Sequence, residues 1–110
     1  MRQLIFKKQS PQGLVDGILR VHEKFIFFKY NNSQQYEQVL NEFKKKGLNI
    51  EKGKGWIKLD LLGNNEFVKL GEYEIDQKLD TLEQIEEKLF KFYKNKYKEL
   101  GFYIEDDNKY

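Results

Sequence analysis

Short stretches of this chain alternate between apolar and polar residues, which is the pattern of half-buried β-strands. Residues 2–6 form the first such stretch, and the only proline follows it in the turn "SPQG" (residues 10–13). Residues 17–32 then predict a β-hairpin whose bend is "HEK". The first part of the chain therefore favours a three-stranded antiparallel arrangement.

The returning strand of this hairpin, "FIFFKY", is apolar on both faces. Ile26, Phe28 and Tyr30 share one face, and Phe25 and Phe27 share the other. Strands of this kind are usually central in a sheet and covered on both sides. We therefore expect both faces of this strand to be covered.

The stretch "NNSQQYEQVLNEFKKKG" predicts a helix. Asn32 or Ser33 can cap its N-terminus, and Asn32 with Gln35 resembles a capping box. Gly47 is the expected left-handed stop. The apolar stripe of this helix consists of Tyr36, Val39, Leu40 and Phe43.

A second helix is predicted to start at Asp80 or Thr81 and to end at Gly101. Asp80 and Glu83 have the spacing of a capping box. Its expected apolar stripe consists of Leu82, Ile85, Leu89, Phe92 or Tyr93, Tyr97 and Leu100.

Between the two helices, residues 55–76 alternate as further antiparallel strands, and "EKGKGW" (residues 51–56) is expected to be a mobile connection. The sequence thus predicts a two-layer α+β fold in the order β-β-β-α-β-β-β-α, with two helices against an antiparallel sheet. The stretch "FYIE" is a candidate for a short C-terminal strand. We expect one domain over residues 1–105 and a polar tail over residues 106–110.

Composition narrows the functional classes. Charged residues make up 35% of the 110 residues, yet the net charge is only +2, which argues against a protein that acts mainly by neutralising phosphates. The chain has no cysteine, so disulfides and thiolate metal sites are excluded. The apolar run at residues 4–6 is too short for a signal peptide or a membrane span. We expect a cytoplasmic protein with no membrane partner and no cofactor.

Candidate catalytic groups are few. His22 is the single histidine, and the hairpin bend predicts an exposed turn residue there. Asp60, Asp76 and Lys78 could serve a metal-dependent nuclease, in which acids hold magnesium near an attacking water. Acid-x-Lys spacing is expected by chance in so charged a chain, so we expect no catalytic residue, no metal site and no enzymatic activity.

The second helix carries a lysine ridge formed by Lys88, Lys91, Lys94 and Lys98. Lysines at this spacing line one helix face and could contact nucleic-acid phosphates. The helix dipole also favours basic residues near a C-terminus, and this explains the same pattern without a ligand. Nucleic-acid binding through the lysine ridge is therefore the alternative hypothesis.

The leading hypothesis is a small non-enzymatic binding protein that docks on a larger protein. Aromatic residues are enriched at such interfaces. Arg2 and Arg20 are the only arginines, a bias typical of A+T-rich coding sequences, so a phage- or mobile-element-encoded inhibitor of a host defence nuclease is one instance. Whether the chain acts as a monomer or a dimer stays open. The candidate contacts are Trp56, Tyr93, Tyr97 and Tyr110.

Overall fold

The computed structural model describes residues 2–61, 63–64, 67–70 and 73–107, and within them the chain forms eight strands and two helices. The first half contains β1 (Gln3–Ser10), β2 (Gly13–Val21), β3 (Phe25–Tyr30), α1 (Ser33–Lys45) and β4 (Ile50–Gly53). The second half contains β5 (Trp56–Asp60), β6 (Phe67–Leu70), β7 (Tyr73–Asp76), α2 (Leu82–Glu99) and β8 (Tyr103–Asp107). The predicted α+β fold is confirmed, and β8 is the candidate C-terminal strand.

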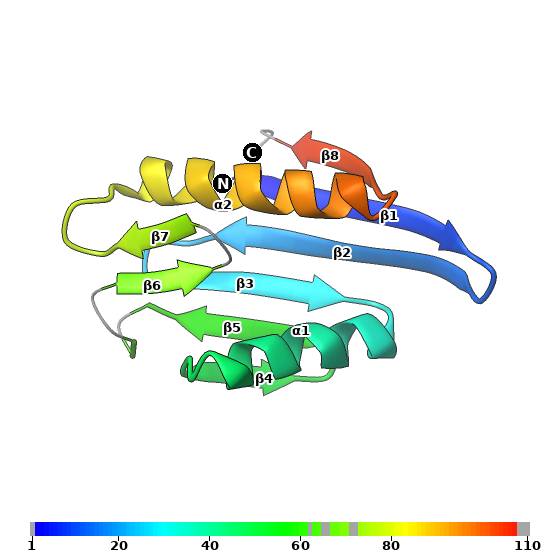
Figure 1. Cartoon of the computed structure of the whole chain (residues 1–110), viewed down its shortest axis with the longest axis horizontal. Helices are drawn as coiled ribbons and strands as arrows, with labels where there is room; N and C mark the ends of the chain where they lie inside the picture. Colours follow the sequence, from blue (N-terminus) through cyan, green and yellow to red (C-terminus); the bar gives the residue numbers. More distant parts are fainter. Residues whose placement is uncertain (1, 62, 65–66, 71–72, 108–110) are drawn as a thin grey trace.

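Six strands form one antiparallel sheet in the order β4-β5-β3-β2-β1-β8, while β6 and β7 pair only with each other. In Figure 1, α1, the β6–β7 hairpin and α2 all lie on one face of this sheet. We call that face the inner face and the opposite one the outer face. No described element crosses the outer face (Figure 1).

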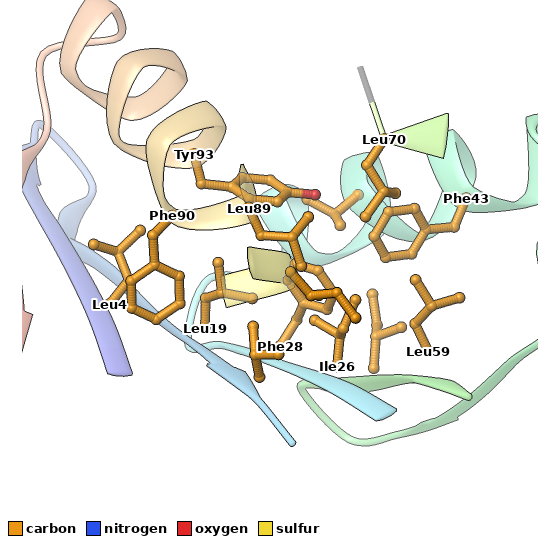
Figure 2. Packing of buried hydrophobic residues seen from close by; sticks show 14 of the residues in the cluster. Leu4, Leu19, Ile26, Phe28, Phe43, Leu59, Leu70, Leu89, Phe90 and Tyr93 are labelled. Carbon is orange, nitrogen blue, oxygen red and sulfur yellow. The ribbon is translucent and has the colours of Figure 1, made fainter. Parts of the chain in front are cut away.

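The core fills the space between the inner face and the layer above it. Strand side chains alternate between faces, so every second residue of each sheet strand points into this space. Phe28 from the sheet, Phe43 from α1 and Tyr93 from α2 meet there edge to face, with ring centroids 5.2 and 5.6 Å from Phe28. Figure 2 shows the surrounding residues that close the core, namely Leu4, Leu19, Ile26, Leu59, Leu70, Leu89 and Phe90.

Both helices end as the sequence predicts. Gly47 follows α1 and Gly101 follows α2, with φ angles of 69° and 86°. Leu48 N donates to Phe43 O, and Phe102 N donates to Tyr97 O, as in a Schellman motif. These contacts explain why a glycine and then an apolar residue follow each helix.

The N-terminus of α1 is confirmed, whereas that of α2 lies one residue from its predicted capping box. Asn32 caps α1 by accepting from Gln35 N. In α2 the capping box joins Thr81 and Gln84, not Asp80 and Glu83. The reason is that the Asp80 carboxylate already accepts from Asp76 N and from Lys88 Nζ, at 2.8 and 2.7 Å.

The expected stripe of α2 is wrong at both ends. Leu82 and Leu100 are 42% and 52% exposed, and Phe90 is buried in their place. Leu82 and Leu100 lie at the first and just past the last turn, beyond the edge of the core that the helix covers. None of the described helices is both long enough and apolar enough to cross a lipid bilayer.

Part of one expected connection and part of the expected C-terminal tail form β-strands. Residues 51–53 belong to β4, which pairs with β5 through a tight turn in which Gly55 has a φ of 78°. Pairing with β5 overturns the prediction of a mobile connection here. Similarly, Asp106 and Asp107 lie in β8 and pair with β1, so these residues are not part of a tail. Residues 108–110 lie outside the described ranges.

A charged cluster joins Arg2, which lies just before β1, to β8 and α2 at the edge of the core. Arg2 Nε donates to Asp106 Oδ1 at 2.8 Å, and Arg2 Nη1 donates to Glu87 Oε1 at 2.8 Å. Lys94 also forms an ion pair with Asp106. The hydrogen bonds from Arg2, more than the opposing effect of burial, lower the pKa of Asp106 to about 2.

Candidate binding surface

The outer face of the six-stranded sheet is partly apolar although no described element covers it. Its apolar residues in the six-stranded part are Ile5, Ile18, Phe25, Phe27, Trp56 and Tyr103. Its charged residues are the basic Lys7, Arg20, Lys29 and Lys58 and the acidic Asp16, Glu51, Asp60, Glu105 and Asp107. This face is therefore mixed in charge and close to neutral as a whole.

A shallow hollow of about 480 Å³ lies in this face, and we call it the aromatic hollow. Two near-parallel ring pairs form much of it. His22 stacks on Phe25 with centroids 4.3 Å apart, and Phe27 faces Trp56 at 6.3 Å and 23°. The hollow is lined by Arg20, His22, Phe25, Phe27, Glu51, Trp56 and Lys58.

Trp56 is held in place by the absence of a side chain across from it. It pairs directly with Gly53 of β4, next to the tight turn. A Cβ atom at Gly53 would lie only 2.2 Å from Trp56 Nε1, so the indole lies against the backbone of that glycine. A large ring over a strand glycine shields backbone that the glycine would leave open. Trp56 is consequently half-buried, with a defined orientation on the outer face.

Two basic side chains flank Phe27 on the neighbouring strands. Arg20 and Lys58 are its register partners on β2 and β5. Lys58 Nζ lies 4.4 Å from the Phe25 ring centroid, and Arg20 Nε donates to Gln3 Oε1 at 2.9 Å. No ion pair joins either of them to a carboxylate within the described residues. The hollow is thus an aromatic surface with two basic groups available to a partner.

The basic groups of the hollow also affect the pKa of His22. Burial lowers the pKa of His22 most, and the positive charges of Arg20 and Lys58 lower it further. Its imidazole is therefore neutral at neutral pH and acts as a flat ring against Phe25. The prediction of an exposed turn residue is only partly right, since His22 follows β2 at the bend but is half-buried.

Of the predicted partner contacts, Trp56 alone lies on a surface that the structure describes. Tyr93 and Tyr97 are only 4% and 2% exposed, because both point from α2 into the core. Tyr97 stacks on Phe6 at 3.9 Å, and its hydroxyl lies 3.1 Å from that of Tyr30. Their prediction as contact residues is wrong for this reason. Tyr110 lies outside the described residues.

The lysine ridge is not uniformly free. Lys88 donates to the Asp80 carboxylate, and Lys94 forms its ion pair with Asp106. Lys91 and Lys98 are exposed and form no ion pair within the described part of the chain. Only half of the ridge therefore offers uncompensated charge to a ligand.

The residues considered for a metal site have other roles where the structure describes them. Asp76 Oδ1 accepts from Lys78 N and Leu79 N, at 3.0 and 3.3 Å, and so stabilises the turn after β7. Asp60 lies at the end of β5 on the outer face. Among the described residues, no group of three or more acidic, histidine or cysteine side chains is placed to hold a metal ion.

Sequence reasoning missed Phe25 and Phe27 as surface residues because it expected their face to be covered. The signal was present across the hairpin, where the bend at residues 22–24 pairs Phe27 with Arg20. A basic residue next to an aromatic one in the register indicates an open face, since an isolated buried charge is unfavourable.

As for relationships to other proteins, no protein-family model, no curated protein and no solved structure matches this chain.

Proposed function

We propose that this protein is a non-enzymatic binding protein that docks on a larger protein through its outer sheet face, with the aromatic hollow at the centre. The observation that carries the proposal is the set of half-buried rings of Phe25, Phe27 and Trp56 on a face that no described element covers. Aromatic side chains set in shallow hollows are the usual anchors of protein interfaces.

The charge of the outer face favours a protein partner over a nucleic acid. Its basic residues are balanced by acids, including Glu51 within the hollow and Asp60 opposite Phe25. A nucleic-acid surface would bring phosphates against these acids, whereas a protein surface can offer both signs of charge. Rings between mixed charges also match the polar rim and apolar centre of a protein interface.

The test compares variants that change the hollow without touching the core. Phe27→Ser removes one ring, Lys58→Glu reverses one flanking charge, and Phe67→Ser is the matched control because Phe67 is an exposed aromatic on β6. Each variant is used as bait in a lysate of the cells in which the protein is made, with and without nuclease treatment. Far-ultraviolet circular dichroism verifies that each bait is folded, because Trp56 emission itself changes when the facing Phe27 ring is removed.

We expect a protein that is retained by the wild type and by Phe67→Ser, lost with both hollow variants, and unaffected by nuclease. Retention by all baits alike would show that the hollow is not the docking site. Capture that disappears after nuclease treatment would instead favour the nucleic-acid alternative.

The low arginine content, which is typical of A+T-rich coding sequences, suggests one instance of this proposal. In it, the protein is an inhibitor from a phage or mobile element that docks on a host defence nuclease. In that instance the captured protein is a nuclease. Purified wild-type chain then lowers its cleavage rate, and Phe27→Ser does not. A captured nuclease whose cleavage rate is unchanged by the wild type would rule out inhibition.

A further inference from the structure

A second hollow, a groove of about 550 Å³, runs between α2 and β8 and shares no lining residue with the aromatic hollow. One wall is the C-terminal half of α2, and the floor is β8 with the residue before it. We call it the edge groove. It is lined by Lys94, Asn95, Lys98, Phe102, Tyr103, Ile104 and Asp106.

The backbone beside this groove is open to pairing. β8 is the last strand of the six-stranded sheet and pairs only with β1. Its other side forms no backbone ladder with any described strand. Edge strands of this kind accept an extended segment of another chain, which then adds to the sheet as a further strand.

The groove wall next to this edge is basic. Lys98 is exposed and has no ion-pair partner in the described part of the chain. Lys94 is paired with Asp106, and Arg2, which also donates to that carboxylate, is itself paired with Glu86 and Glu87, so the uncompensated positive charge of this wall is that of Lys98. The wall therefore complements a carboxylate near Lys98.

The floor of the groove is apolar. Phe102 and Ile104 are half-buried against the core, and Tyr103 is 68% exposed. Because side chains of an added strand alternate in direction, every second one would point toward Phe102 and Ile104 beneath α2. Apolar side chains fit these positions, and an acidic side chain fits the end near Lys98.

Two other occupants are disfavoured by the acids of β8. Glu105 and Asp107 pair with Ile5 and Gln3 and so project from the outer face beside the edge. A second copy of this chain paired edge to edge would bring these acids against their own copies, and like charges across strands are destabilising. A nucleic-acid backbone would meet the same repulsion.

We infer that the edge groove binds an extended segment of a partner protein, which pairs with β8 as a seventh strand and places an acidic side chain at Lys98. The segment is short, with apolar side chains facing Phe102 and Ile104. This inference goes beyond the proposed function, because it concerns a separate surface and does not depend on Trp56 or Phe27.

The experiment selects displayed random peptides on the immobilised full-length chain. Parallel selections use Lys98→Glu and a control, Lys45→Glu, which reverses an exposed lysine at the end of α1. Affinities of the selected peptides are then measured by fluorescence anisotropy. Hydrogen exchange with and without peptide identifies the amides that become protected.

We expect acidic peptides that bind the wild type, Lys45→Glu and Phe27→Ser alike and that lose about tenfold or more in affinity with Lys98→Glu. Their binding should slow exchange in β8, which contact with the lysine alone would not do. No enrichment, peptides without acidic residues, an unchanged affinity for Lys98→Glu, or protection elsewhere than β8 would each overturn the inference. Because Phe27→Ser keeps peptide binding, failure here is distinguishable from failure of the aromatic hollow.

Discussion

Replacing Gly53 by alanine should expel the only tryptophan from its place on the outer face. The new Cβ would lie 2.2 Å from Nε1 and 2.3 Å from Cε2 of Trp56. Both atoms belong to a rigid ring, so the whole indole must move away from the strand. The substitution thus tests whether Gly53 is what positions the centre of the proposed docking surface.

The size of the effect follows from the contact that is lost. A tryptophan buries ~150–250 Å² when fully packed. For the half-buried Trp56, displacement exposes about 100 Å², which at ~25 cal/mol/Å² corresponds to about 2.5 kcal/mol. Alanine is better than glycine in a strand by about 0.5 kcal/mol. The expected net loss is about 2 kcal/mol, or about 8 °C in Tm for a chain of 110 residues.

Tryptophan fluorescence during urea unfolding measures both consequences in one experiment, since Trp56 is the single tryptophan. Gly53→Ala should shift the native emission to longer wavelength and lower the unfolding midpoint. Gly63→Ala is the matched control, because the nearest atom to its Cβ would be 3.6 Å away, which is ordinary contact. An unchanged emission maximum and midpoint in Gly53→Ala would refute the packing argument.

Two further predictions concern the charged cluster and the core. Asp106 has a folded pKa of about 2 beside Arg2 and Lys94, so its contribution to stability is complete above about pH 4 and is lost as the pH falls toward 2. Asp106→Asn should therefore lower the free energy of unfolding by roughly 1–2 kcal/mol at pH 7 and by much less at pH 2, as measured by urea titration at both pH values. Tyr97→Phe leaves the buried Tyr30 hydroxyl without its partner and should lower the free energy of unfolding by about 1–3 kcal/mol. The double variant with Tyr30→Phe should lose less stability than the sum of the two single variants, and an additive result would show that the hydroxyls do not interact.

Local signals in the sequence were sufficient for much of the fold. Asn32, Gly47 and Gly101 mark helix ends through contacts with their own neighbours, and the structure places the ends there. The start of α2 was harder because Asp80 and Thr81 both offer a cap. Thr81 is the cap since the carboxylate of Asp80 is taken by Lys88 and by the turn after β7, and the sequence spacing alone does not reveal this.

Long-range placement decided the rest. The strand β4 has only one strongly apolar residue, Ile50, so its pattern is weak and its pairing with β5 determines its structure. Whether Phe25 and Phe27 are covered depends on which side of the sheet both helices and the β6–β7 hairpin lie, a property of the whole topology. The sequence alone could therefore predict only one residue of the candidate surface, Trp56.

The pairing of β1 with β8 has a kinetic consequence. Gln3 and Asp107 are register partners although 104 positions separate them, and closing so long a loop is entropically unfavourable. Contacts of high sequence separation also slow folding, because the entropy of the intervening chain must be lost before the contact can stabilise the protein. Completion of the sheet should be a late step that awaits α2 and its terminal glycine. Until then the free edge of β1 is exposed in the folding chain, and it stays open to aggregation until β8 pairs with it.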